Sequence, residues 1–209
     1  MPEDPRHVRL KSLDLDALHG ELWAWLGRGV ADRKSPLRTP TLSCLDGQGR
    51  PSARVIVLRA ADPTSHTLTF HTDVRAGKVK GLRRSPWVEW VFWDPGLQIQ
   101  IRARGVATLH HHDELAATEW ARIHPGSQRV YLAHPAPGTA VDVPTSGLTP
   151  AQERGLSRDE DAAPGFANFA VVRCTVRALE WLLIARSGHQ RAQINYTADG
   201  ERSGQWLVP

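Results

Sequence analysis

Apolar side chains near the start of the chain recur at the spacing of a helix. Residues three, four or seven positions apart lie on one side of a helix, and here they are Leu15, Leu18, Leu22, Trp25 and Leu26. We therefore predict an amphipathic helix over residues 12–29. Ser12 is its expected N-cap, and Gly27 and Gly29 are expected to end it.

Most of the remaining chain shows alternating or β-branched runs, which predict strands. The first two, 39–45 and 52–59, flank the glycine-bearing turn at 46–50 and predict a hairpin. The other predicted strands are 67–72, 87–93, 97–109, 169–176, 179–184, 190–196 and 205–208. This order favours a mainly β fold of the α+β class, a small and mostly antiparallel barrel with helices at its ends.

Three segments interrupt the strands. Residues 75–84 predict a short helix, and residues 113–123 predict a second amphipathic helix. Residues 134–165 are rich in Pro, Gly, Thr and Ala, and form a long connection with a short helix at 149–155. Such connections inside a compact domain are often functional.

Length and composition limit the class of protein. The 209 residues, of which 41% are hydrophobic, suit one domain. No stretch is apolar enough to cross a membrane, and the acidic start lacks the apolar core of a signal peptide, so we expect a cytoplasmic protein. Cys44 and Cys174 suggest neither a disulfide framework nor a zinc site. The net charge of +4 comes from scattered residues, which favours an anionic ligand weakly and nucleic acid hardly at all.

Two segments carry cations at the ends of predicted strands. Arg54 and Arg59 flank an apolar run, and Thr72, Arg75 and Lys78 follow another strand. Guanidinium groups bind phosphate through two parallel hydrogen bonds, and a lysine adds a point charge, so a phosphate site is one interpretation. The alternative is solvent-facing arginines, which spacing alone favours. Arg54 and Arg59 also have opposite parity, which places them on opposite faces of a flat strand.

Two further patterns have structural alternatives. The strand at 97–109 carries Gln98 and Gln100 on a polar face, which either faces solvent or lines a polar ligand. His110, His111 and His112 would point to alternating faces and have no carboxylate or cysteine at a ligand spacing. We therefore interpret these histidines as structural and expect no metal site.

Taken in order, these segments resemble the pyridoxamine 5'-phosphate oxidase family from about residue 35 onward. The resemblance rests on the 54–59 strand, Phe70-His71-Thr72 with Lys78 six residues later, the strand from Gln100 to Ala107, and the closing His189-Gln190-Arg191. Each motif is weak alone, whereas four in the right order are fairly specific. The resemblance implies a split β-barrel that binds flavin mononucleotide (FMN) at the interface of a homodimer.

The resemblance also implies roles for single residues on the phosphate side. Arg54, Lys78 and the Thr72 region would hold the FMN phosphate and ribityl chain. Gly77 stands where relatives often carry an arginine, so one phosphate ligand is absent or Arg75 replaces it. The full set of expected FMN-binding residues is Arg54, Val55, Ile56, Val57, Arg59, His71, Thr72, Arg75, Lys78, Gln100, Trp181 and Arg191.

On the ring side, the resemblance implies that Gln100 reaches the flavin from the partner subunit. Arg191 matches an arginine near the pyrimidine end, where a cation favours the electron-rich reduced flavin. The family tryptophan near Trp181 has at best shifted by one position. His189 is the candidate catalytic residue, because it lies where it would touch the substrate. Ser187 replaces a further active-site arginine.

The family's substrate-phosphate residues are altered in this chain. Arg59 stands in for a lysine, Trp120 for a tyrosine and His124 for an arginine, while Ser127 is retained. With His189, these are the expected substrate-binding residues. The departures weaken the assignment of substrate far more than that of FMN.

The resemblance implies an FMN-dependent oxidoreductase in which a small substrate passes a hydride to flavin N5. A substrate other than pyridoxamine 5'-phosphate is favoured. The alternative is a non-catalytic split-barrel protein that binds FMN, a B6 vitamer or haem, and a third interpretation is a basic barrel without flavin. The expected partners are the small-molecule substrate and a second copy of the chain, with no nucleic acid and no membrane.

Overall fold

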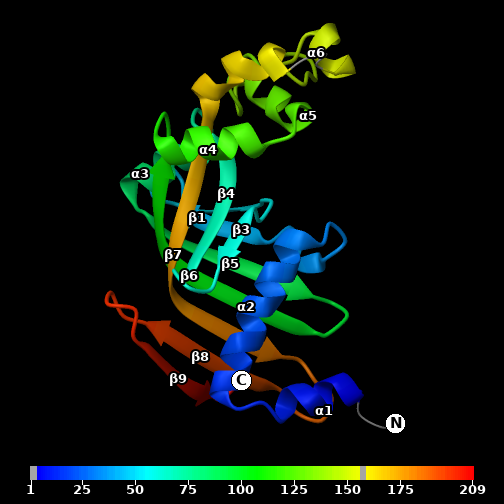
Figure 1. Ribbon diagram of the computed structural model, residues 1–209, viewed down its shortest axis with the longest axis vertical. Helices are drawn as coiled ribbons and strands as arrows, with labels where there is room; N and C mark the ends of the chain where they lie inside the picture. Colours follow the sequence, from blue (N-terminus) through cyan, green and yellow to red (C-terminus); the bar gives the residue numbers. More distant parts are fainter. Residues whose placement is uncertain (1–3, 156–158) are drawn as a thin grey trace.

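We describe the protein from a computed structural model, over residues 4–155 and 159–209. Its helices are α1 (Pro5–Lys11), α2 (Leu15–Ala31), α3 (Gly77–Arg84), α4 (Glu114–Arg122), α5 (Pro125–Gln128) and α6 (Pro150–Arg154), with 3-10 segments at Pro36–Arg38, Arg129–Leu132 and Asp159–Asn168. Its strands are β1 (Thr41–Leu45), β2 (Pro51–Val55), β3 (Ala60–Asp62), β4 (Thr67–Asp73), β5 (Trp87–Asp94), β6 (Ile99–His110), β7 (Phe169–Leu183), β8 (Gln190–Tyr196) and β9 (Arg202–Leu207). Figure 1 shows α2 lying across the strands, with α4, α5 and α6 at one end of the molecule.

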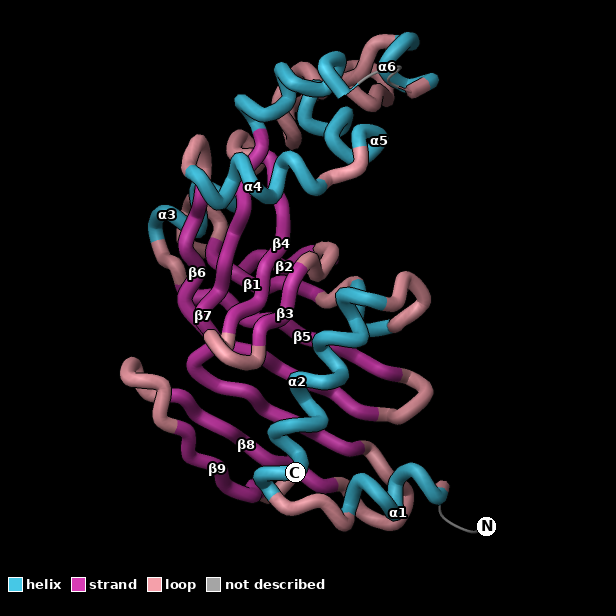
Figure 2. Tube along the Cα trace, in the orientation of Figure 1, coloured by secondary structure: helices cyan, strands magenta, loops and turns pink. Residues whose placement is uncertain are grey.

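The strands form one antiparallel sheet, and Figure 2 draws them as the magenta segments of the tube. Within the described residues, the main strand order is β2-β1-β5-β6-β7-β4-β3, and β8 and β9 extend the sheet from a second part of β7. Several strands that follow one another in the chain also pair in the sheet in antiparallel orientation, namely β1 with β2, β5 with β6 and β8 with β9. The predicted mainly β fold with flanking helices is confirmed.

The sheet divides along β7. One edge of β7 pairs with β6 along nearly its whole length, while the other pairs first with β4 and then with β8. The register shifts between Arg104 and Gly105 of β6, where the division falls. A Cβ atom at Gly105 would lie 2.2 Å from Thr175 O, so only glycine permits this approach. The two parts of the sheet that meet along β7 do not close into a complete barrel. This open arrangement is that of a split barrel.

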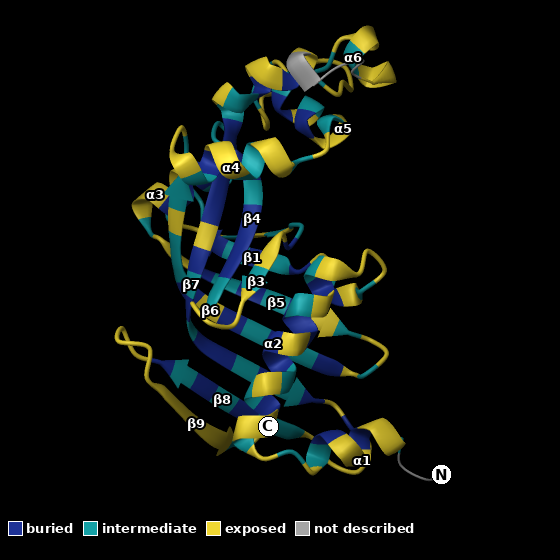
Figure 3. Ribbon diagram, in the orientation of Figure 1, coloured by how far each residue is buried: buried dark blue, intermediate teal, exposed yellow. Residues whose placement is uncertain are grey.

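The core lies between α2 and the inner face of the sheet. Leu18, Leu22 and Leu26 of α2 are fully buried there, which confirms the predicted apolar stripe. They pack with strand residues that include Trp90 and Trp181, both also fully buried. Burying each leucine contributes about 1.5–3 kcal/mol relative to leaving it in water. Figure 3 shows this core as dark blue along β4 and β7, whereas β9 is exposed.

The predicted ends of the first helix were wrong. Asp14 caps α2, since its carboxylate accepts a hydrogen bond from the Ala17 backbone N–H, whereas Ser12 ends the unpredicted α1. The glycines do not stop α2, which continues to Ala31. At Gly29 a Cβ atom would lie 3.0 Å from Leu37 O, so this glycine instead lets the helix pack against the following segment.

Two strand predictions also need correction. β2 ends at Val55, so Arg59 lies outside it, and the backbone N–H of Arg59 instead donates to Thr69 O of β4. The predicted strands 169–176 and 179–184 are one strand, β7, because β6 pairs with both parts. The short β3 was not predicted.

The second amphipathic helix is confirmed as α4. Its N-cap is Asp113, whose carboxylate accepts a hydrogen bond from the Ala116 backbone N–H. α4 covers a smaller apolar cluster that includes Tyr131 and Phe169. The helix expected inside the long connection is also present, since Thr149 caps α6. In the described parts of the chain, we find no helix with the length and apolarity to span a bilayer.

Candidate functional site

A cavity of about 520 Å³ separates the β1–β2 hairpin from the start of α3, and we call it the cation cavity. Its lining residues are Asp46, Gly47, Gln48, Arg50, Ser52, Arg54, Gly77, Lys78 and Lys80. Beside it, Lys78 Nζ donates to Thr72 Oγ1 over 3.0 Å. Tertiary structure thus brings Arg54, Lys78 and Thr72 together from β2, α3 and β4.

Two cations lie at the centre of this cavity, and within residues 4–155 and 159–209 neither has a carboxylate partner. Arg54 donates to neutral acceptors, the carbonyl oxygen of Ser52 at 3.0 Å, its Oγ at 2.6 Å and Cys44 Sγ at 2.9 Å. Among the described residues, neither Arg54 nor Lys78 forms an ion pair. Burial lowers the pKa of Lys78, and the nearby charge of Arg54 lowers this pKa further. Two adjacent, partly buried cations without a counter-ion favour binding of an anion.

The cavity depends on how closely α3 approaches β1. At Gly81 a Cβ atom would lie 1.8 Å from Leu45 O, so no other residue fits without moving the helix. This approach holds Lys78, one turn earlier, beside the hairpin. Gly77 at the start of α3 has open space around it, with nothing within 4 Å of a Cβ atom there.

The other residues expected on the phosphate side lie in different surroundings. Arg75 donates to the carboxylate of Asp73, at 3.0 and 2.6 Å, and to Ala133 O, and it does not line the cation cavity. Val55 is the last residue of β2 and its side chain is exposed, and Ile56 and Val57 follow the strand. Arg59 is exposed near His71 and Tyr131. Burial lowers the pKa of His71, and the charge of Arg59 lowers it further. Burial raises the pKa of Tyr131 to about 12, against the opposing charge of Arg59.

His71 occupies a mostly buried position on β4. Its Nε2 lies 3.3 Å from Glu119 Oε2 of α4, and its ring meets Phe169 edge to face. Burial lowers the pKa of His71 to about 4, against the opposing effect of Glu119. His71 Nδ1 is buried and has no hydrogen-bond partner among the described residues.

A second group of expected residues forms a row across the sheet. Trp93, Gln100, Leu182 and Arg191 lie opposite one another on β5, β6, β7 and β8. Opposed residues of antiparallel strands project from the same face. The four side chains of this row therefore share one face of the sheet, which is the outer face. Arg191 Nη2 donates to Glu180 Oε2 at 2.9 Å, whereas its Nε is buried and has no partner among the described residues.

The two groups lie on opposite faces of the sheet. Arg54 pairs with Leu42 and Leu42 with Trp90, so Arg54 shares the inner face with two fully buried residues. Trp90 and Trp93 have opposite parity on β5, so the row with Gln100 projects outward. Within one chain, the cation cavity and the Gln100 row therefore do not face each other.

Trp181 does not join the Gln100 row. It pairs with Ile101 and Ala192, is fully buried in the core and contacts Trp206 edge to face. Its indole N–H has no partner among the described residues. We therefore assign Trp181 to the core, on the opposite face from Gln100.

His189 lies in the connection between β7 and β8, two residues before Arg191. Its Nδ1 accepts a hydrogen bond from the Ala185 backbone N–H at 3.2 Å. His189 and Arg191 both line a cavity of about 450 Å³, which we call the His189 cavity. The structure thus brings the candidate catalytic residue next to the row that includes Gln100.

Comparison with known proteins shows which family this chain resembles. Residues 22–111 match the family described as "Pyridoxamine 5'-phosphate oxidase, FMN-binding domain". By this match, by its curated relatives and by its fold, the chain is similar to the pyridoxamine 5'-phosphate oxidase-like family. This result confirms the resemblance and supports flavin binding.

Relatives named pyridoxine/pyridoxamine 5'-phosphate oxidase match to different extents. The relative from Pseudomonas putida (strain GB-1) is 31% identical over 83 residues, which are 39% of this chain and 38% of the relative. The matched part thus spans little more than a third of that oxidase. The relative from Psychrobacter arcticus is 24% identical over 189 residues, covering 90% of this chain and 87% of the relative.

Solved structures of the family share the fold. A pyridoxamine 5'-phosphate oxidase-related, FMN-binding protein from Nostoc punctiforme matches with a TM-score of 0.73 and 22% identity, covering 94% of this chain and 100% of that protein. PhzG from Burkholderia lata, solved with tetrahydrophenazine-1-carboxylic acid, matches with a TM-score of 0.69 and 18% identity over 91% of each chain.

The residues present in this chain fit FMN. Among the described residues, Arg54 and Lys78 form no ion pair, so they suit a phosphate dianion. Arg191 Nε is a buried donor with no hydrogen-bond partner in the same part of the chain, so it can donate to an acceptor on a ligand. Flavin carbonyl oxygens and ring nitrogens are acceptors of this kind. The cation cavity and the Gln100 row therefore supply the two chemistries that FMN requires.

Two of the residues expected to bind a substrate phosphate, Trp120 and His124, make contacts within the protein itself. The Trp120 ring packs edge to face or tilted against Tyr131, Phe166 and Phe169. His124 caps α5, since its Nδ1 accepts from the Gly126 backbone N–H at 3.1 Å. Ser127 is exposed on the same short helix.

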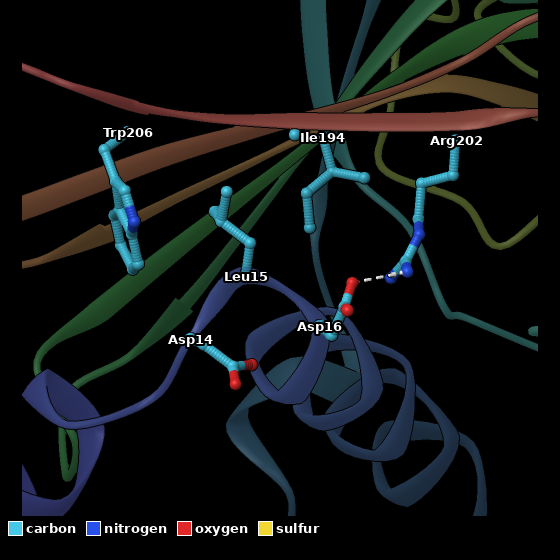
Figure 4. A pocket seen from close by; sticks show the side chains of 7 residues that line it. Asp14, Leu15, Asp16, Ile194, Arg202 and Trp206 are labelled. Atoms are coloured by element: carbon cyan, nitrogen blue, oxygen red, sulfur yellow. Dashed lines mark hydrogen bonds and ion pairs between the residues drawn. The ribbon is translucent and has the colours of Figure 1, made fainter.

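A further cavity, of about 510 Å³, lies between the start of α2 and strands β8 and β9 (Figure 4). Asp14, Asp16, Arg202 and Trp206 are among its lining residues. Here Arg202 pairs with Asp16 at 2.6 Å, the dashed line in Figure 4. Because its cation is neutralised, this cavity differs from the cation cavity, and we do not assign it to the cofactor.

Sequence reasoning missed several residues of the site. Ser52 and Cys44 position Arg54, Glu180 holds Arg191, and Glu119 contacts His71. The position of Ser52, two residues before Arg54 on the same strand face, was the one available signal. Cys44, Glu119 and Glu180 reach their partners only through strand pairing and helix packing.

Proposed function

We propose that this protein is an FMN-dependent oxidoreductase that acts on a small planar substrate. The observation that carries the proposal is the pair Arg54 and Lys78, two partly buried cations that face one cavity and form no ion pair among the described residues. The match to an FMN-binding domain over residues 22–111 includes both residues.

We further propose that two copies of the chain build each flavin site. The opposite-face arrangement of Arg54 and Gln100 supports this proposal, because one flavin cannot contact both within a single chain. In a homodimer, the cation cavity of one copy would meet the Gln100 row of the other. Trp87 and Trp93 lie on the same face of β5 at opposite ends of the strand, and both are exposed, which is consistent with a covered face.

In this arrangement, the chain's own residues bind and orient the cofactor. Arg54 and Lys78 would hold the phosphate, and Gln100 would donate to the ring system from the partner subunit. Arg191, held by Glu180, would place a positive charge beside the pyrimidine end. Bound FMN would supply the hydride acceptor, N5 of its ring system. His189 would contact the substrate from the adjacent cavity.

We propose a substrate other than pyridoxamine 5'-phosphate. Trp120 and His124, at two of the family's substrate-phosphate positions, are engaged in packing and helix capping. The complex of PhzG with tetrahydrophenazine-1-carboxylic acid supports a different substrate for this fold.

The first test is a visible absorption spectrum of the purified protein, followed by heat release and mass identification of the chromophore. Bands near 370 and 450 nm that release FMN would support the proposal. Turnover is then tested with planar amines, alcohols and carboxylates, with dioxygen as acceptor. A colourless protein that does not bind added FMN would overturn the proposal. Retained FMN without turnover on any substrate would favour the non-catalytic alternative.

A further inference from the structure

Two strands share one edge of β7, and we call the place where one gives way to the other the seam of the sheet. β4 pairs with this edge up to Thr175, and β8 begins to pair with it at Ala178. Between them, the Val176 backbone N–H donates to His66 O over 2.8 Å. His66 directly precedes β4, and Tyr196 is the last residue of β8. These two residues therefore face each other across the seam from separate parts of the sheet.

Four ring side chains close the seam, and we call them the ring cluster: His19 and Trp23 of α2, His66 and Tyr196. The His66 ring stacks on Tyr196, with the ring centroids 4.0 Å apart and the planes 28° from parallel. Trp23 Nε1 donates to Tyr196 Oη over 2.9 Å, and His19 Nε2 lies 2.9 Å from the same oxygen. The ring cluster thus joins α2, the start of β4 and the end of β8.

The hydroxyl of Tyr196 favours the neutral form of His19. An indole N–H can only donate, so Tyr196 Oη accepts from Trp23 and keeps its own proton for donation. The acceptor of that proton is His19 Nε2, which carries a lone pair in the neutral tautomer with its proton on Nδ1. Protonation of His19 places an N–H on Nε2 and removes this acceptor. The hydroxyl of the buried Tyr196 then loses a hydrogen bond, which is unfavourable.

The charges around the ring cluster also oppose protonation. Burial lowers the pKa of His19, the charges of Arg202 and His66 lower it further, and Asp16 opposes them. Burial lowers the pKa of His66 as well, Asp62 opposes this effect, and Arg202 adds to it. Both carboxylates already have partners, since Asp16 pairs with Arg202 at 2.6 Å and Asp62 accepts hydrogen bonds within its own turn. A histidine whose pKa is lowered in the folded state stabilises that state at neutral pH, and this stabilisation is lost as the pH falls below about 6.5.

We propose that the ring cluster is an acid-sensitive latch that holds the two parts of the sheet together at the seam. At neutral pH both histidines are uncharged and the seam is closed. In mild acid, protonation of His19 and His66 adds two positive charges near Arg202 and removes the hydrogen bond donated by Tyr196, so the seam opens. Because β8 also carries Arg191, this opening moves one side of the candidate site. The inference goes beyond the proposed function and does not depend on flavin binding.

The test is amide hydrogen exchange of the full chain, followed by mass spectrometry at pH 7 and at pH 5.5 and corrected for the intrinsic exchange rate at each pH. Peptides that cover α2, β8 and β9 report on the seam, and peptides that cover β5 and β6 report on global unfolding. The ratio of the opening constants at the two pH values is the acid effect.

The wild type is compared with a double variant, His19→Gln with His66→Asn, in which neither residue can become charged. Glutamine keeps an acceptor for Tyr196, and asparagine suits the left-handed backbone at position 66, where φ is 50°. His112→Asn is the matched control, because it makes the same replacement at a left-handed position, with φ of 58°, between β6 and α4. His19→Gln alone keeps the stack of His66 on Tyr196.

In the wild type, the acid effect on the seam peptides should be about tenfold, as expected for the loss of one buried hydrogen bond. At pH 5.5 these peptides should exchange faster than those of β5 and β6, because the seam opens without global unfolding. The double variant should show an acid effect of less than about twofold on the seam peptides, and His19→Gln alone about threefold. His112→Asn should resemble the wild type.

Three results would each overturn the inference: no acid effect on the seam peptides of the wild type, an undiminished acid effect in the double variant, or seam peptides that exchange no faster than β5 and β6 at pH 5.5. If the double variant already exchanges at pH 7 as fast as the wild type does in acid, His19→Gln decides. An undiminished acid effect in that single variant would then overturn the inference, and a reduced one would support it.

Discussion

Lys78 Nζ lies 3.0 Å from Thr72 Oγ1, which joins the first turn of α3 to the end of β4 at the edge of the cation cavity. This hydrogen bond uses one of three ammonium protons and leaves the positive charge unneutralised. Because Arg54 lies on the facing strand, two positive charges are close together, which is electrostatically unfavourable until an anion binds. The cavity therefore resembles a binding site more than a structural ion pair.

Replacing both cations, Arg54→Ala with Lys78→Ala, should abolish FMN retention while the barrel stays folded. Each charge-assisted hydrogen bond to phosphate contributes about 1.5–3 kcal/mol, so the affinity should fall by a factor of about 100 or more. The flavin-free variant should be at least as stable as the wild type, because two like charges are removed. Flavin fluorescence titration and thermal unfolding measure the two effects.

Arg50→Ala is the matched control for this pair. Arg50 lines the same cavity, but its side chain is 70% exposed and pairs with Asp46 at 3.0 Å. Its loss should change FMN affinity by less than about threefold. Equal effects of the control and the double variant, or full flavin occupancy in the double variant, would refute the assignment of the cavity.

Mixing two defective chains tests whether the site is shared. One chain carries the Arg54 and Lys78 replacements, and the other carries Gln100→Ala with Arg191→Ala. If two copies build each site, a mixed dimer regains one intact site, in which the phosphate side and the ring side come from different chains. Co-expression with two affinity tags isolates the mixed dimer for flavin quantification. A mixed dimer as empty as its parents, or a monomer that binds FMN, would exclude a shared site.

Gly81→Ala tests whether the approach of α3 to β1 sets the cavity. A Cβ atom at this position would lie 1.8 Å from Leu45 O, so α3 must move and Lys78 must move with it. We expect a loss of more than about 2 kcal/mol in the free energy of unfolding, together with weaker FMN binding. Gly77→Ala, in the same helix but in open space, should be neutral or slightly stabilising. Similar values for both variants in urea unfolding would contradict this account.

His71 predicts a loss of stability in mild acid. Burial lowers its folded-state pKa from 6.5 to about 4, so between these values the unfolded chain binds more protons than the folded one. Stability should therefore fall as the pH drops from about 6.5 to about 4. The contribution of His71 to this fall should be on the order of 2–3 kcal/mol.

His71→Asn isolates this contribution from those of His19 and His66, whose pKa values burial also lowers. Urea unfolding at pH 7 and pH 5 should show a smaller loss for the variant than for the wild type. An identical loss in both proteins would show that the pKa of His71 is the same in the folded and the unfolded chain.

The periodic patterns predicted most elements because they depend on local geometry. The stripe of Leu18, Leu22 and Leu26 and the caps Asp113 and Thr149 act within one or two turns. Competing local signals caused the errors, since Ser12 and Asp14 are both good N-caps and packing of the preceding α1 decided between them. The parity argument about Arg54 and Arg59 does not apply, because β2 ends before Arg59. The two arginines nevertheless lie apart, since Arg59 does not line the cation cavity.

By itself, the sequence determined the fold class, and the family resemblance selected Arg54, Thr72, Lys78, Gln100 and Arg191. Tertiary structure alone decided which of them meet. It placed Arg54 and Gln100 on opposite faces, moved Trp181 into the core, and brought Lys11 to Ser187 across 176 positions. The physical reason is the sequence separation over which each interaction acts. Hydrophobic periodicity and capping act over a few residues, whereas strand register and helix docking, which assemble a binding site, join residues that are far apart in the sequence.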